Sequence, residues 1–157
     1  TQGVPFIRGA HFCLEDGEVR INHPAYDIGI EEGSIERSQA LWKGPIEPRG
    51  ISRVACQAIV NAQKERRLRW VVVAPDCVLG NSVNFLQLPD VVLDSLAVEH
   101  GSVDEGLLFV AAQLNSEALN LWSRAWAANN NVNNYELESL PLPPPSTEGA
   151  LNYALRQ

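Results

Sequence analysis

The pattern of apolar and polar residues predicts a set of short strands in the first ninety residues of the chain. Residues 68–74 are mostly apolar and rich in valine, and a proline–aspartate pair follows them, as is typical of a buried strand. Residues 15–50 are rich in glycine, proline and acidic residues and are expected to be mostly loop. Further strands are predicted at residues 4–9, 77–80 and 83–88, with shorter candidates at 19–21 and 40–42.

Two helices are predicted after residue 100. Ser102 and Glu105 have the spacing of a capping box, in which both side chains satisfy backbone N–H groups where a helix begins. Apolar residues then recur every three or four positions up to Leu114. Residues 115–116 interrupt this pattern and can begin a second helix, whose apolar face carries two tryptophans that we expect in the core. Asparagine-rich residues 129–134 should end it, and the prolines that follow keep the chain extended.

Residues 51–61 fit either a helix or a strand. Their apolar positions recur at helical spacing, whereas their valine and isoleucine content suits a strand. The pattern alone leaves both alternatives open.

The bulk composition is that of one globular domain of 157 residues. No apolar run approaches the roughly 20 residues needed to cross a bilayer, and the first residues do not have the pattern of a signal peptide. The chain contains no methionine, so we expect it to be a domain of a longer protein. Its three cysteines form no Cys-x-x-Cys pair and are expected to be reduced, buried or half-buried thiols.

The net charge of −7 is unevenly distributed. Residues 43–70 hold seven lysines and arginines against two glutamates, so this segment is basic within an acidic chain. A basic segment of this kind can follow the phosphates of a nucleic acid. The alternative is a solvated face that balances acidic neighbours.

No catalytic motif is recognisable in the sequence. An acidic residue two positions before a lysine, as metal-dependent nucleases use, is absent, and so are Gly-x-Gly and Gly-x-Ser-x-Gly. The three histidines lack the spacing of metal ligands. The chain is therefore predicted to have no enzymatic activity and no metal site of its own.

Four segments occur in an informative order along the chain. They are residues 4–9 (VPFIRG), residues 53–57 (RVACQ) followed by 61–68 and 80–85, residues 114–120 (LNSEALN), and residues 131–143 (NVNNYELESLPLP). In this order they resemble the target-recognition domain of Taq-type adenine-specific DNA methyltransferases and of the related fused type II restriction-modification enzymes. The cofactor-binding glycine motif and the (Asn/Asp)-Pro-Pro-(Tyr/Phe) catalytic motif of the methyltransferase domain in that family are absent here.

The resemblance implies a strand rather than a helix around residues 52–59. With the pattern described above, it gives an α+β fold with a mixed, largely antiparallel twisted sheet and a C-terminal pair of helices. Residues 1–145 would form the target-recognition domain and residues 146–157 a tail or linker.

The resemblance also implies a function. The domain would recognise a sequence in double-stranded DNA and position a target adenine for a methyltransferase domain, covalently linked or separate, that uses S-adenosylmethionine. Some enzymes of the resembling family also carry a fused nuclease domain. No cofactor is expected in this domain, no membrane partner is implied, and the expected location is the bacterial or archaeal cytoplasm.

Candidate DNA-binding residues follow from the chemistry of base recognition. Arginine suits guanine, asparagine and glutamine suit adenine, and lysine, arginine and small polar groups hold phosphates. The candidates are Arg53, Gln57, Lys64, Arg66, Arg67, Arg69, Asn81, Ser82, Asn84, Asn130, Asn131 and Asn133. Each has a structural alternative: an arginine can cover a sheet edge, Asn81 can occupy a left-handed turn, and the asparagine run can be a solvated turn.

A second hypothesis is a protein-interaction module. The acidic remainder of the chain and the proline-rich residues 140–145 motivate it, because such segments adopt a preformed extended helix that partner domains bind.

Overall fold

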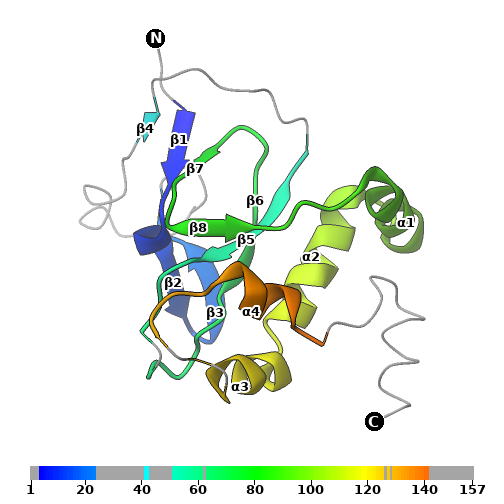
Figure 1. Ribbon diagram of the computed structural model, residues 1–157. Helices are drawn as coiled ribbons and strands as arrows, with labels where there is room; N and C mark the ends of the chain where they lie inside the picture. Colours follow the sequence, from blue (N-terminus) through cyan, green and yellow to red (C-terminus); the bar gives the residue numbers. More distant parts are fainter. Residues whose placement is uncertain are drawn as a thin grey trace.

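The computed structural model describes residues 4–23, 41–42, 51–61, 63–125, 127 and 129–141 of the chain. In its central sheet, β5 (Arg53–Gln57) lies between β6 (Trp70–Val73) and β8 (Val83–Phe85), and both pairs are antiparallel (Figure 1). Residues 53–57 are therefore a strand, which resolves the ambiguity of the sequence pattern. The predicted tail at residues 146–157 and the prolines at 143–145 lie outside the described residues.

Shorter strands surround the central sheet. β1 (Val4–Ile7) pairs in parallel with β7 (Val78–Leu79) and antiparallel with β4 (Leu41–Trp42). A short 3-10 helix, η1 (Gly9–His11), leads to the antiparallel hairpin of β2 (Phe12–Glu15) and β3 (Glu18–Ile21). Most pairs are antiparallel and one is parallel, so the predicted mixed, largely antiparallel α+β fold is confirmed.

The described residues contain four α-helices rather than the predicted two: α1 (Asp90–His100), α2 (Val103–Leu114), α3 (Glu117–Ala125) and α4 (Asn134–Glu138). α2 and α3 were predicted, whereas α1 and α4 were not. In α1, Pro89 occupies the N-cap position without a side-chain hydrogen bond. Two exposed valines, Val91 and Val98, also obscure its apolar periodicity. α4 is a five-residue helix inside the segment expected to be a turn and an extended chain.

The joint between α1 and α2 follows capping rules. Gly101 ends α1 with a left-handed φ of 92°, and the Ser102 hydroxyl accepts a hydrogen bond from Glu105 N at 3.1 Å. The two helices then pack very closely, because a Cβ added to Gly106 would lie 2.6 Å from the Cβ of Leu96.

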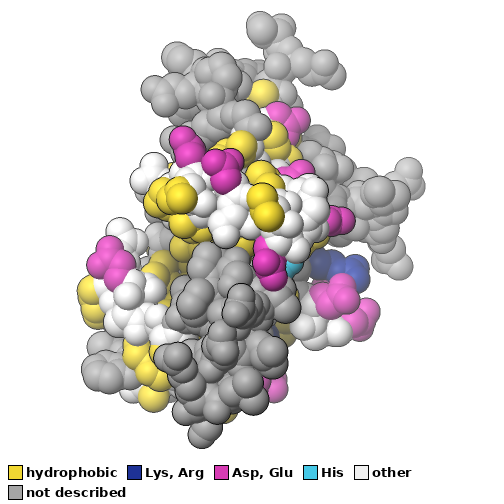
Figure 2. Space-filling model, turned by 90° about the vertical axis from the view of Figure 1, so that its right-hand side faces the viewer, with side chains coloured by type: hydrophobic (Ala, Val, Ile, Leu, Met, Phe, Trp, Pro, Cys, Tyr) yellow, Lys and Arg dark blue, Asp and Glu magenta, His cyan; other side chains and the backbone are white. Residues whose placement is uncertain are grey.

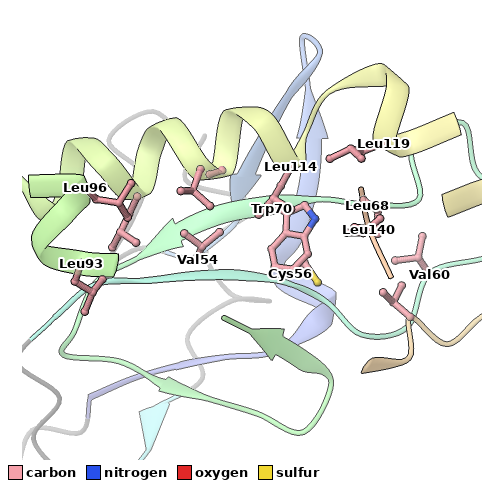
Figure 3. Close-up of a cluster of buried hydrophobic side chains, with 14 residues drawn as sticks. Val54, Cys56, Val60, Leu68, Trp70, Leu93, Leu96, Leu114, Leu119 and Leu140 are labelled. Atoms are coloured by element: carbon pink, nitrogen blue, oxygen red, sulfur yellow. The ribbon is translucent and has the colours of Figure 1, made fainter. Parts of the chain in front are cut away.

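Both faces of the central sheet are buried. Val54 and Cys56 point to the core shared with the helices, whereas Ala55 points to a second cluster with Ile7 and Val73. This is why residues 53–57 show no apolar–polar alternation. In Figure 3, Trp70 lies near the middle of the helix-side core. Leu93 and Leu96 of α1 lie at one end of this core, and Val60 and Leu140 lie at the other.

The tryptophans and cysteines largely meet expectation. Trp70 is buried and Trp122 packs partly buried against the core, while Trp126 lies outside the described residues. The three cysteines are free thiols, two buried and one half-buried, and burial raises the pKa of the Cys56 thiol. Among the described helices, none combines the length and apolar character required to cross a membrane.

Candidate nucleic-acid interface

Hydrogen bonds join four distant segments of the chain at one edge of the molecule. The Ser82 hydroxyl accepts from Gly9 N, and its carbonyl accepts from Ala58 N, both at 2.9 Å. Ile59 then forms an antiparallel bridge with Asn131, in the loop that precedes α4 (Figure 1). We call this surface the amide edge and define it as residues 8–9, 57–61, 63–64, 81–84 and 129–133.

Gly9 is required for this arrangement by space rather than by backbone conformation. A Cβ at this position would lie 2.7 Å from the Ser82 carbonyl oxygen, which is closer than real Cβ contacts allow. The glycine therefore lets the loop after β1 approach the turn before β8.

Arg67 lies beneath the amide edge and is completely buried. Its Nη2 donates to Asn131 O at 2.7 Å and to Glu136 Oε2 at 2.9 Å, and its Nη1 donates to Asn129 O at 3.0 Å and Val60 O at 3.4 Å. The Glu136 side chain is also buried, with an exposed fraction of 5%. The pair thus connects the segment that leads into β6 to α4 and to residues 129–133, which we call the asparagine loop.

Two further buried or half-buried asparagines order the segment around Arg67. Asn120 accepts from Arg67 N and donates to Glu65 O, both at 2.9 Å. Asn115 accepts from Trp70 N at 2.9 Å and donates to Trp70 O at 2.7 Å, so its amide acts as a strand partner for β6. Both residues belong to the segment at 114–120 that contributed to the family resemblance, and the structure gives them a structural role.

The amides of the edge divide into two groups. Some stabilise the loop: Asn84 Nδ2 donates to Val132 O at 2.7 Å, Asn129 Oδ1 accepts from Asn131 N at 2.8 Å, and Asn133 Nδ2 donates to Glu136 Oε1 at 3.1 Å. Among the other predicted asparagines, Asn81, Asn130 and Asn131 are exposed at the surface. Gln57 is half-buried, and its Oε1 has no hydrogen-bond partner among the described residues.

The arginine predictions need correction. As direct DNA contacts, Arg53 and Arg67 are wrong, because both are buried, with exposed fractions of 7% and 0%. Arg53 Nη2 donates to Cys77 O at 2.8 Å, and its guanidinium lies 5.6 Å from the centroid of the Phe85 ring. Arg67 and Arg69 both lie before β6, which begins only at Trp70.

The remaining basic candidates differ in exposure. Arg66 is 18% exposed, donates to Asn115 O at 2.6 Å and pairs with Glu117 at 3.4 Å. Arg69 is half-buried and donates to Phe12 O at 3.4 Å. Lys64 is exposed at the amide edge. Lys43, Glu47 and Arg49 lie outside the described residues, so the basic segment contributes much less surface charge at the described positions than its composition suggests.

The helices α1 to α3 present the opposite chemistry. They carry six carboxylates and one arginine: Asp90, Asp94, Glu99, Asp104, Glu105, Glu117 and Arg124. Figure 2 views the side of the molecule that holds α1 and shows acidic and apolar side chains interspersed. These carboxylates would repel a phosphate backbone.

Next to the amide edge, η1 buries a histidine. Arg8 N donates to His11 Nδ1 at 3.1 Å, and the His11 and His23 rings are 5.6 Å apart between centroids. Burial, followed by the charges of His23 and Arg8, lowers the pKa of His11 to about 4. His11 is therefore neutral at pH 7 and accepts the hydrogen bond that shapes the loop.

A cleft of about 520 Å³ opens at the other end of β5. It is lined mainly by apolar residues of β5, β8 and the first two helices, among them Val54, Leu88, Leu93 and Leu107. None of its lining residues belongs to the amide edge, and its apolar walls do not suit a phosphate backbone.

Comparison with known proteins adds no assignment, because no protein-family model, curated protein or solved structure matches this chain. Within the described ranges, no group of three histidine, cysteine or acidic residues could hold a metal ion. A functional proposal for this chain therefore rests on its own residues and their arrangement.

Sequence reasoning did not identify several exposed residues of the amide edge. Arg8, Asn61 and Gln63 are exposed there, beside the candidates Lys64 and Asn81. Arg8 lies within the first segment of the resemblance, and Asn61 and Gln63 lie within the second. The resembling segments therefore already contained these exposed polar residues.

Proposed function

We propose that this chain is the DNA target-recognition module of a restriction-modification system in a bacterial or archaeal cytoplasm. The carrying observation is that parts of the resembling segments meet. Residues 8–9, 57–61, 63–64 and 81–84 and the asparagine loop form the amide edge, and residues 114–120 order the segment that leads to it. Segments that are far apart in sequence and converge on one polar surface indicate a shared binding role.

The amide edge suits the recognition of a duplex. Exposed amides such as Asn81 and Asn131 offer a donor and an acceptor together, as adenine requires in the major groove. Lys64 and Arg8 are exposed beside them and can contact phosphates, which fix the register of the protein on DNA. A separate methyltransferase domain with S-adenosylmethionine would modify the adenine.

Selection from a randomised library of duplexes tests the proposal. We expect the full chain to enrich one sequence motif, with affinity that falls steeply as salt rises. Lys64→Ala should weaken binding to all duplexes alike, whereas Asn81→Ala should reduce discrimination at one position. Gln87→Ala is the matched control, because this exposed amide lies outside the amide edge. Failure to enrich any motif at low salt would refute the proposal.

The protein-interaction alternative rests on a different surface. Val91 and Val98 are 73% and 87% exposed on α1, on the same side of the helix as Asp94. Reversing charges in Asp94→Lys/Glu99→Lys separates the two functions. Under the DNA proposal this variant enriches the same motif as the wild-type chain. If instead neither chain enriches a motif and the variant loses a protein partner that the wild-type chain binds, the alternative is favoured.

A further inference from the structure

We propose that Asn131 and Ile59 lie side by side as a reader of an A·T base pair, held in place by the buried Arg67–Glu136 pair. The inference rests on the proposed function. It adds the kind of base pair that the amide edge recognises and the residues that recognise it.

The bridge between the two segments places these side chains together. The flanking hydrogen bonds come from Val60 N to Asn130 O at 2.7 Å and from Val132 N to Ala58 O at 2.8 Å. With this pattern Ile59 and Asn131 are a non-hydrogen-bonded antiparallel pair, in which the Cα atoms are about 4.5 Å apart and both side chains leave the same face.

That face points to solvent. Ile59 is 55% exposed and Asn131 is exposed, whereas the neighbours Val60 and Val132 are buried at 4% and 3%. The Ile59 side chain therefore contributes little to the core and is available for an external contact.

The two side chains match the major-groove edge of an A·T pair. Adenine presents N7 as an acceptor and N6 as a donor, which one asparagine amide satisfies with two hydrogen bonds. Thymine presents a C5 methyl group, which takes an apolar contact. A G·C pair offers no methyl group, and its guanine presents two acceptors, N7 and O6, in place of adenine's acceptor and donor, so it fits neither side chain.

Arg67 is the positioning residue for this reader. It donates to Asn131 O at 2.7 Å and to Asn129 O at 3.0 Å, and Glu136 neutralises its charge at 2.9 Å. Asn131 N in turn donates to Asn129 Oδ1 at 2.8 Å. Both backbone groups of Asn131 are therefore occupied within the loop, which leaves its side chain as the part available to a ligand.

The first experiment uses the duplex enriched by the full chain, with thymines replaced one at a time by uracil, which lacks the methyl group. At one position we expect uracil to weaken wild-type binding about fourfold, as loss of one buried methyl group predicts. Ile59→Ala should be insensitive to the same replacement. Asn131→Ala should lose roughly 5- to 150-fold of the discrimination against G·C at that position.

The second experiment tests, without DNA, whether the buried Arg67–Glu136 pair holds the reader in place. We call this pair the clamp. Arg67→Met/Glu136→Leu replaces the buried pair with apolar side chains, which proteins often tolerate without loss of stability. We expect faster hydrogen exchange at the Asn131 and Val132 amides, together with reduced A·T preference. Arg66→Met is the matched control for exchange, because Arg66 contacts Asn115 and Glu117 and not the loop.

The two experiments separate failure of the inference from failure of the proposed function. If a motif is enriched but every thymine tolerates uracil and Asn131→Ala keeps full discrimination, the A·T reader is wrong while DNA recognition stands. If no motif is enriched, the function fails, and unchanged exchange in the double variant would independently overturn the clamp.

Discussion

The α1–α2 hairpin and the amide edge pack against opposite ends of the same apolar core, yet they are held by different forces (Figure 3). The hairpin satisfies its backbone within each helix and packs through buried leucines such as Leu96 and Leu107. The asparagine loop is joined to residues 58–60 by a single bridge, and the carbonyls of Asn129, Asn131 and Val132 accept from the side chains of Arg67 and Asn84. The hairpin exposes carboxylates, whereas the edge exposes amides.

This difference shows where buried polar groups are needed. An irregular loop that lies against a core must find partners for its N–H and C=O groups, since water cannot reach them. Side-chain donors of fixed geometry then determine the shape of the loop more sharply than apolar contacts do. The shape of the amide edge is therefore set mainly by polar contacts, and that of the hairpin by apolar packing.

The largest effect is expected from Arg67→Met. The change leaves the Glu136 carboxylate buried without its partner and removes the donors to the loop carbonyls. We expect the free energy of unfolding in urea to fall by about 3–5 kcal/mol. Arg67→Met/Glu136→Leu should recover the part of this loss that comes from the unpaired carboxylate, whereas the part that comes from the loop carbonyls should remain. If Arg67→Met unfolds at the same urea concentration as the wild-type chain, polar contacts do not hold the edge.

A smaller effect is expected at the hairpin from Gly106→Ala. Helix propensity alone favours alanine by about 1 kcal/mol. The added Cβ would nevertheless lie 2.6 Å from that of Leu96, so we expect a net loss of roughly 1–3 kcal/mol in the same urea assay. Combining it with Leu96→Ala should cost less than the sum of the two single changes. A stabilised Gly106→Ala variant would contradict close packing of the helices.

Mild acid should loosen the loop around His11, beside the amide edge, before it affects the α1–α2 hairpin. Because the pKa of His11 is lowered to about 4 from its usual 6.5, the unfolded chain binds a proton between these values that the folded chain does not. The contribution of His11 to stability is complete above pH 6.5 and is lost as the pH falls toward 4, by at most about tenfold in the unfolding equilibrium per pH unit.

Unfolding at pH 7, 5.5 and 4.5 measures this dependence, with His11→Asn as the control that should flatten it. Hydrogen exchange should rise first at residues 8–11, whose loop depends on neutral His11, and later in α1 and α2. Simultaneous loosening of both regions would mean that His11 does not act locally.

Regular elements with local signals were predictable from the sequence. Ser102 marked the start of α2, and the apolar run at 68–74 contained β6. α1 was missed because Pro89 provides no side-chain cap and exposed valines blur its periodicity. The burial of Arg67 could not be foreseen either, since its partner Glu136 is 69 residues away and its other acceptors are backbone carbonyls, which carry no residue identity.

That separation has a consequence for how the chain acquires its shape during synthesis. The guanidinium of Arg67 emerges with the central strands, but its counter-charge follows only after α1, α2 and α3 have been translated. Until then, a solvated arginine is more stable than a buried one, so the strand segment around it cannot close prematurely. The amide edge is thus completed only after α4 has left the ribosome.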